Sequence, residues 1–591
     1  MAANTDKEIV LHRVIMVVFG ALSGFALWTL VGQWDNPALA PTLYLVLFSF
    51  VATFASVALV LAGPVPMVRA VQAASCSAII MTSLFCLAAL RYLVATDVLD
   101  DPIVLFLASV LVLISTPFLM VWMQDRSGWL DYAQLFDAAW SMTVRYTVAW
   151  GFVGIFWLVV FLGNALLNLV DVSLIDIVIR TDWMRFGLTG AVLGLGLSVV
   201  FELRGMISHY LVLRLLRLLL PLVLAMVIVF IGAVPVRGLT HLFGEFSAAA
   251  TLMGTAIAAL TLISAALDRD DTSAVRTKGL RLATRVLALT VPLLTALALW
   301  AVVMRVRQYG WTPDRLLALT FALVLFAYGA GYCLSVLIPG SWMARIRQVN
   351  VALALLVFLV ALTCMTPLLD FYRISTKSQI ARFESGRVSL DKLSLWAMAH
   401  DWGKAGRAGI AALEAMTDRP DHEDLVDRIT TMRSEDSAFQ FERSVNRQAA
   451  PARVAELLEH LPLRPDGIVI AEDRFIDVPD YRVDGWLKGC KQELPDGRAG
   501  CVLVQGAFAP AVAAVDQAAV LYIGQDGRVQ ADHVVWRDGT VNVSGMFDAL
   551  TGEWSSLPAD ILSKALDGAF EIRPSGENAL FLGGSALVSA P

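Results

Sequence analysis

The segment most suggestive of chemistry is GKAGRAG at 403–409, where glycines surround a lysine and an arginine. Glycine-rich loops that bind nucleotide phosphates need the spacing GxxxxGK followed by Ser or Thr. This segment has neither that spacing nor that ending. Gly403, Gly406 and Gly409 recur three residues apart, which places them near one another on a helix. We therefore predict that they allow close helix packing.

Other residue types capable of catalysis or metal binding are scattered. The sequence has no metalloprotease helix motif, no GxGxxG and no GxSxG. Its C-terminal histidines lack ligand spacing; they are His400, His422, His460 and His533. Two acidic pairs offer oxygen ligands to a cation, although solvated acidic loops are the stronger interpretation; they are Glu472-Asp473 and Asp480/Asp484. We assign no catalytic, cofactor-binding or metal-binding residue and expect no cofactor.

Two cysteines, Cys490 and Cys501, are the only ones beyond residue 370, and they flank the turn-forming residues 495–498. We predict a disulfide between them, which would indicate an oxidising compartment. A two-residue turn at Asp496-Gly497 would instead pair position 490 with 503, so a bulge or another turn must bring the sulfurs together. The alternative is two unrelated thiols.

Composition divides the chain between two solvents. Hydrophobic residues make up 58% of the sequence, and the mean hydropathy is +0.68. Soluble globular chains are usually about 45–50% apolar. Residues 370–591 hold 23 Lys and Arg against 33 Asp and Glu, a net of −10, which leaves +4 for residues 1–369. An acidic C-terminal region argues against nucleic-acid binding.

The elements that must position any site are membrane-spanning helices, because a span needs roughly 20 apolar residues. The sequence predicts eleven spans, at 14–33, 42–62, 76–95, 103–123, 147–170, 185–203, 216–236, 248–267, 284–304, 316–338 and 349–369. The predicted fold is thus a polytopic α-helical membrane domain at 1–369, a soluble helical region at 370–463 and an α+β domain at 464–591. A total of 10 or 12 spans is the alternative to 11.

The predicted spans contain few polar groups. Asn164 and Asn168 are separated by one helical turn, and we expect them to contact a neighbouring helix. Arg91 weakens the third span, and we expect its long side chain to extend to the lipid headgroups. Residues 126–144 and 205–215 are predicted as interfacial helices or as caps over the membrane domain.

The soluble region changes character near Asp466. Helices are predicted at 389–417, as one helix or as two that meet at a tight turn, and at 421–433 and 451–461, the last opened by Pro451. Short runs rich in β-forming residues follow at 468–471, 486–490, 501–505, 519–523, 529–536 and 540–543. A helix at 558–568 and two further strands complete the predicted domain.

Basic residues predict the orientation, because Lys and Arg accumulate in cytoplasmic loops. The N-terminus and the even-numbered connections hold most of them: Lys7, Arg13, Arg69, Arg126, Arg145, Arg204, Arg214, Arg269, Arg276, Lys278, Arg281, Arg345 and Arg347. The opposite loops hold Arg180, Arg237, Arg305, Arg307 and Arg315. We therefore predict a cytoplasmic N-terminus and, with an odd number of spans, a periplasmic C-terminal domain in a bacterial inner membrane.

Three segments resemble a family: RQYGWTPDR at 307–315, LLDFYRISTKSQIARFESGRV at 368–388 and WGKAGRAGIAALEAM at 402–416. They are similar to a bacterial multi-pass inner-membrane family known as domain of unknown function 4153. The resemblance covers roughly residues 140–416 and implies inner-membrane placement without an assigned activity. The positions it singles out are Tyr309, Gly310, Thr312, Arg315, Ser375, Ser378 and Gln379, for which a capped turn and a polar collar at the membrane surface are the expected roles.

Three functions are compatible with this organisation. The first is a non-enzymatic envelope protein that anchors a periplasmic binding, sensing or scaffolding domain. The second is a transporter or lipid translocase, which a polar cavity near Asn164 and Asn168 would favour. The third is an envelope enzyme, which needs two carboxylates in one cleft. The expected partners are the lipid bilayer and other envelope proteins or polymers, with no nucleic acid.

Overall fold

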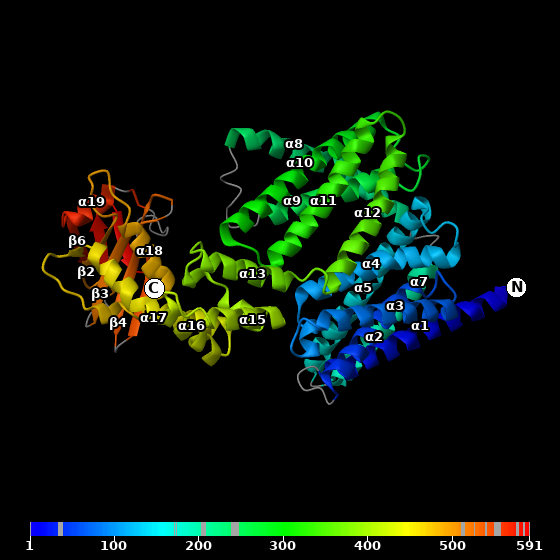
Figure 1. The fold of residues 1–591 in the computed structure, drawn as a ribbon, viewed down its shortest axis with the longest axis horizontal. Helices are drawn as coiled ribbons and strands as arrows, with labels where there is room; N and C mark the ends of the chain where they lie inside the picture. Colours follow the sequence, from blue (N-terminus) through cyan, green and yellow to red (C-terminus); the bar gives the residue numbers. More distant parts are fainter. Residues whose placement is uncertain are drawn as a thin grey trace. The chain divides into compact units, whose positions relative to one another are not determined.

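The protein is seen here in a computed structural model (Figure 1). The structure describes residues 2–33, 39–170, 172, 174–202, 209–237, 248–509, 515–524, 526–537, 540–548, 557–558, 560–574, 578–582 and 585–589. The chain forms two compact units, unit 1 at Met1–Thr417 and unit 2 at Asp418–Pro591.

Unit 1 is built on long apolar helices. Eleven helices within the described residues are long and apolar enough to cross a membrane, matching the predicted number. They are α1 (Ala2–Val31), α2 (Pro41–Leu61), α3 (Met67–Ala89), α4 (Pro102–Gln124), α5 (Tyr132–Asn168), α7 (Asp182–Glu202), α8 (His209–Arg237), α9 (Ala248–Leu267), α10 (Lys278–Tyr309), α11 (Pro313–Leu337) and α12 (Trp342–Met365). Short elements η1 (Ala95–Leu99) and α6 (Leu174–Arg180) connect some of them.

Residues 126–144 do not form the separate interfacial helix that the sequence suggested. Asp131 accepts a hydrogen bond from the Ala133 N–H and begins α5, which then continues without a break to Asn168. Arg145, which follows this stretch, is buried and donates to the Ala62 carbonyl at 3.3 Å. Its side chain therefore lies inside the helix packing. Of the second stretch, residues 205–208 lie outside the described residues, as does Arg204, and the remainder begins α8.

Glycines allow α1 and α7 to pack with backbone contact. A Cβ built on Gly190 would lie 2.0 Å from the Gly20 carbonyl oxygen, and one on Gly20 would lie 2.1 Å from the Gly190 oxygen. Gly24 and Gly194 make equally close approaches one turn along. Two glycines four residues apart on each helix form the small-residue pattern typical of close membrane-helix pairs.

The chain after α12 continues within unit 1. It forms α13 (Phe371–Glu384), η4 (Leu390–Lys392), α14 (Leu395–His400) and α15 (Gly403–Glu414), and α13 contacts α11 and α15 (Figure 1). The structural boundary therefore falls between 417 and 418, whereas the sequence suggested boundaries at 369/370 and 463/464. The change of solvent in the sequence marks where the apolar helices end. It does not mark where side-chain contacts with them end.

Unit 2 contains one mixed sheet between helices. Its helices are α16 (His422–Ser434), α17 (Ala438–His460), η5 (Glu472–Phe475), α18 (Asp480–Cys490) and α19 (Asp560–Leu566). The described strands are β1 (Leu463–Arg464), β2 (Cys501–Gln505), β3 (Asp516–Ile523), β4 (Val529–Arg537), β5 (Thr540–Asp548), β6 (Phe570–Pro574), β7 (Asn578–Leu582) and β8 (Ser585–Ser589). They lie in the order β1-β2-β3-β4-β5-β8-β7-β6, with only β1 and β2 parallel among the described pairs.

Both faces of this sheet are covered. Val502 and Val504 of β2 pack with α19, while Leu503 packs with Trp486 of α18 and Val454 of α17. Alternate residues of a strand point to opposite faces. The continuous apolar sequence of β2 therefore reflects burial on both sides.

Three predictions in unit 2 were wrong. Residues 486–490 form the end of α18, since Val483, Trp486 and Leu487 bury one helical face against β3. Residues 468–471 form no strand. The helix containing Pro451 begins at Ala438, where the Ser437 hydroxyl accepts the Gln440 N–H at 3.2 Å.

The helical placement of Cys490 resolves the register difficulty of the predicted disulfide. Cys490 is the last residue of α18 and Cys501 the first of β2, and a disulfide joins them. The intervening residues form a loop between helix and strand, so no two-residue hairpin is involved. Both cysteines are buried beside Trp486.

Candidate functional site

Helix α13 is central to the candidate site. It follows α12, the last of the long apolar helices, and presents two polar faces. Asp370 begins it, accepting hydrogen bonds from the N–H groups of Tyr372 at 3.0 Å and Arg373 at 3.2 Å. Residues separated by three, four and seven positions share one helix face. One face carries Ser375, Ser378, Gln379 and Arg382, and the other carries Arg373, Thr376, Lys377 and Ile380.

The first face meets the turn between α10 and α11. Gly310 ends α10 with a φ of 79°, a conformation that favours glycine. The Thr312 hydroxyl then accepts the Arg315 N–H at 3.4 Å, and Pro313 begins α11. The Arg315 guanidinium donates back to the Gly310 carbonyl at 2.9 Å and lies 5.3 Å from the Tyr309 ring centre.

Side chains of α13 hold this turn from the other side. Gln379 Nε2 donates to the carbonyls of Tyr309 at 3.2 Å and Trp311 at 3.0 Å. The Trp311 N–H donates to Ser378 Oγ at 3.3 Å. Arg382 donates to the carbonyls of Arg307 and Gln308. We call these contacts between residues 307–315 and α13 the exit clasp.

The exit clasp contains six of the seven positions that the family resemblance singled out. Ser375 is the exception: it is fully buried, and its hydroxyl has no hydrogen-bond partner within the described structure. Arg382 was missed by the sequence analysis. The helical spacing of Ser375, Ser378 and Arg382 was the available signal.

Replacing Gln379 tests the exit clasp. Gln379→Leu should lower the free energy of unfolding by about 2 kcal/mol, since two carbonyls lose their amide donor and leucine offers none. Thermal unfolding of the purified protein in detergent measures the change. Gln308→Leu, at an exposed position of the same segment, is the control and should have little effect. Equal effects from the two substitutions would contradict the role assigned to the Gln379 amide.

A buried carboxylate ties the start of α13 to α4. The hydroxyls of Tyr92 and Tyr372 both donate to Asp101 Oδ2, while Asp101 Oδ1 accepts the Ile103 N–H at 2.8 Å. Burial, together with the nearby carboxylate, raises the pKa of both tyrosines, so they remain protonated donors. No sequence pattern predicts this cluster, because Tyr372 lies 271 residues from Asp101.

Asp101→Asn should destabilise unit 1 by about 1–3 kcal/mol, because an amide has one acceptor oxygen and cannot accept from both tyrosine hydroxyls and from the Ile103 N–H. Asp100→Asn, the same change at the exposed neighbouring residue, is expected to be nearly neutral. Thermal unfolding of both variants in one detergent compares them. The assignment fails if Asp100→Asn costs as much as Asp101→Asn.

Arg91 does not extend to the headgroups as predicted. It is only 9% exposed, and its Nη2 donates to the carbonyls of Cys364 at 2.8 Å, Thr366, and Leu369 at 3.2 Å. The C-terminal carbonyls of α12 have no intrahelical partners and attract a cation. Arg91 therefore caps α12 and joins it to α3.

The glycines of 403–409 pack closely, as predicted. A Cβ on Gly403 would lie 2.5 Å from the Arg91 carbonyl oxygen, and Gly403 has a φ of 53°. A Cβ on Gly406 would lie 2.0 Å from the Met398 oxygen, and one on Gly409 would lie 2.4 Å from Thr376 Cγ2. The Lys404 side chain donates to the Leu90 carbonyl at 3.0 Å. The segment thus brings α15 against α13 and the end of α3.

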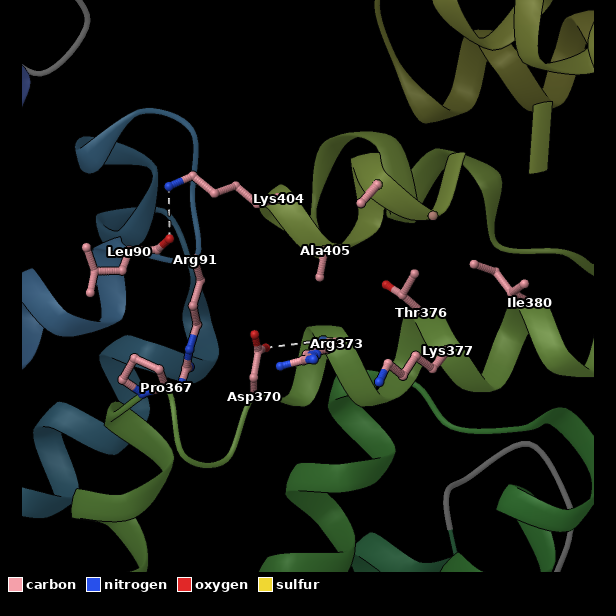
Figure 2. Close-up of a pocket in the computed structure, with 12 residues that line it drawn as sticks. Leu90, Arg91, Pro367, Asp370, Arg373, Thr376, Lys377, Ile380, Lys404 and Ala405 are labelled. Carbon is pink, nitrogen blue, oxygen red and sulfur yellow. Dashed lines mark hydrogen bonds between the residues drawn. The ribbon is translucent and has the colours of Figure 1, made fainter. Parts of the chain in front are cut away.

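A pocket of about 470 Å³ lies between α13, α15 and residues 90–91 (Figure 2). Its charged lining residues are Arg91, Asp370, Arg373, Lys377 and Lys404. Most of the remaining wall is apolar, including Pro367, Ile380 and Ala405. The pocket combines an apolar surface with a cationic one and contains no pair of carboxylates.

A second charged network, which the sequence analysis also missed, lies at the C-terminal end of α9. Asp268, 2% exposed, pairs with Arg217 of α8, and Arg347 of α12 donates to Asp271 Oδ1 at 2.7 Å and to the Leu267 carbonyl at 2.7 Å. These contacts hold the C-terminus of α9 between two helices.

The remaining predicted polar residues have structural partners or are exposed. Asn164 Nδ2 donates to Asp176 Oδ1 of α6 at 3.2 Å, and Asn168 is exposed at the end of α5. Asp480 and Asp484 both face Arg453, at 2.5 and 3.7 Å. One arginine therefore pairs with both carboxylates and balances one of their two charges.

Comparisons of the chain with protein-family models, with curated proteins and with solved structures find no match. The resemblance to the family of unknown function stays a prediction, and the function is inferred from the site and the two-unit organisation.

Proposed function

We propose that this chain is a non-enzymatic protein of the bacterial inner membrane that anchors unit 2 on the periplasmic side. Unit 1 supplies eleven helices suited to crossing a bilayer. The excess of Lys and Arg in one set of loops supports a cytoplasmic N-terminus. Unit 2 then serves as a binding, sensing or scaffolding module for other envelope proteins or polymers.

The observation that carries this proposal is the disulfide between Cys490 and Cys501 in the core of unit 2. Disulfides persist in oxidising compartments and are rare in the cytosol. The odd number of candidate spans among the described residues supports the same placement, since an odd number puts residues before the first span and after the last one on opposite sides. The four other cysteines belong to the apolar helices of unit 1.

The transporter or lipid translocase alternative has less support. A polar cavity near Asn164 and Asn168 would favour it. Asn164 is instead bonded to Asp176, and Asn168 is exposed.

Cross-linking in intact spheroplasts tests the anchoring role. A membrane-impermeant amine reagent reaches the exposed Lys488, Lys491 and Lys564 of unit 2 only if unit 2 lies outside the inner membrane. The proposal predicts cross-linked envelope partners with the full chain and their loss when the chain ends at Thr417. The same set of partners from both chains would contradict the proposal.

A further inference from the structure

The pocket on the second face of α13 has the chemistry of an anion site. Four of its lining residues are cationic, namely Arg91, Arg373, Lys377 and Lys404, and only Asp370 is anionic. The Asp370 carboxylate is occupied with the first N–H groups of α13. Arg91 and Lys404 donate to backbone carbonyls and keep their charges. The net charge of the lining is therefore +3.

Two of the cations are available to a ligand. Arg373 and Lys377 lie one turn apart on α13, both are exposed, and neither has an acidic partner among the described residues. Figure 2 shows their side chains and that of Thr376 extending from the same helix, opposite Lys404 and Ala405.

Thr376 provides an independent observation. Its side chain lines the pocket and is 5% exposed, yet its hydroxyl has no hydrogen-bond partner in the described structure. A buried hydroxyl without a partner costs free energy, and in helices it usually bonds to a carbonyl one turn back. Figure 2 shows its oxygen directed to the space between α13 and α15.

The surroundings indicate a ligand with an apolar body. The pocket forms where α3 and α12 end, both of them helices apolar enough to cross a membrane. Leu90 in its wall is 59% exposed, and Leu368, which follows the lining residue Pro367, is 84% exposed. Leucines so exposed beside a cationic pocket suit the region where acyl chains meet headgroups.

We propose that this pocket binds the phosphate-bearing headgroup of an anionic phospholipid. Arg373 and Lys377 neutralise the phosphate, the Thr376 hydroxyl donates to it, and the apolar wall contacts the adjoining glycerol and acyl carbons. The ligand chemistry is a phosphate ester whose headgroup carries a net negative charge, joined to an apolar body. This site rests on the membrane insertion of unit 1 but not on the anchoring role of unit 2.

Hydrogen exchange of the full chain in an uncharged detergent tests this site. Phosphatidylglycerol should slow exchange in Phe371–Glu384 and Gly403–Glu414, and phosphatidylcholine with the same acyl chains should not. Arg373→Gln with Lys377→Gln should raise the half-protecting concentration by about 30-fold. Equal protection by the two lipids would overturn the proposal.

Two controls separate this pocket from a diffuse charged surface and from a structural effect. Arg387→Gln with Lys392→Gln removes the same charge at exposed positions outside the pocket and should leave protection unchanged; an equal loss would overturn the proposal. Thr376→Val should raise the half-protecting concentration of phosphatidylglycerol by about tenfold. It should not lower the thermal stability of the protein in phosphatidylcholine. An unchanged response would exclude the hydroxyl contact and with it the proposed site.

A soluble ligand distinguishes the two sources of phosphate. Glycerol 1-phosphate lacks the apolar body, so at millimolar concentration it should give no protection. Protection equal to that of phosphatidylglycerol would overturn the lipid assignment.

Discussion

Gly190→Leu is expected to cost about 3 kcal/mol or more, because the α1–α7 contact has no space for any side chain. A Cβ at Gly190 would lie 2.0 Å from the Gly20 oxygen, which is backbone and cannot turn aside. The helices must separate, and the ion pair of Arg13 with Glu202 at the end of the contact should be lost with them. Unfolding in mixed micelles of increasing SDS content measures the loss.

Gly187→Leu is the matched control on the same helix. A Cβ at Gly187 meets nothing within 4 Å, so leucine there should change stability by no more than about 0.5 kcal/mol. Similar losses from the two variants would mean that α1 and α7 do not meet through these glycines.

Replacing both Cys490 and Cys501 by alanine is expected to destabilise unit 2 by about 3 kcal/mol, since the disulfide closes a loop across 11 positions. Denaturant unfolding of the full chain, followed on the transition of unit 2, measures the change. Dithiothreitol should shift that transition in the unaltered chain and not in the variant.

Cys86→Ala and Cys333→Ala are the controls for the disulfide. Both thiols are free and lie in α3 and α11, so their removal should leave the transition of unit 2 in place. If neither the reductant nor the Cys490/Cys501 replacement shifted the unfolding transition of unit 2, the disulfide would contribute no stability.

The sequence predicts the long helices of unit 1 well. A helix in an apolar solvent requires a continuous run of apolar residues, which can be recognised without knowledge of the tertiary structure. The prediction fails where one helix carries two environments. Residues 126–144 were predicted to be an interfacial helix or a cap, yet Asp131 begins α5 as a helix cap and Arg145 donates to the Ala62 carbonyl inside the packing. The α1–α7 glycine contact was not predicted, although Gly20 and Gly24, like Gly190 and Gly194, are four residues apart.

In unit 2 the errors have a different origin. Residues 486–490 combine Trp, Leu and Cys, which suit a strand, yet tertiary packing of Val483, Trp486 and Leu487 against β3 selects a helix. Strand β4 was predicted well, at 529–536. The turn-forming residues Asp526-Gly527 precede it and can be recognised from the local sequence alone.

The candidate site was only half predictable. The family resemblance led to the exit clasp, because its residues occur in two short segments that the structure joins. The pocket on the other face of α13 combines residues 90–91, 367–380 and 404–409, and no local pattern links them. Helix α13 thus connects both features, holding the α10–α11 turn with one face and forming the pocket wall with the other.

Reporter fusions after Pro591 test the proposed topology most directly. An alkaline phosphatase that is active only after export should be active there, and a fluorescent protein that matures only in the cytosol should be dark. An inactive phosphatase and a bright fluorescent protein would place unit 2 in the cytoplasm, on the side predicted for the N-terminus. That result would contradict the proposed periplasmic anchoring.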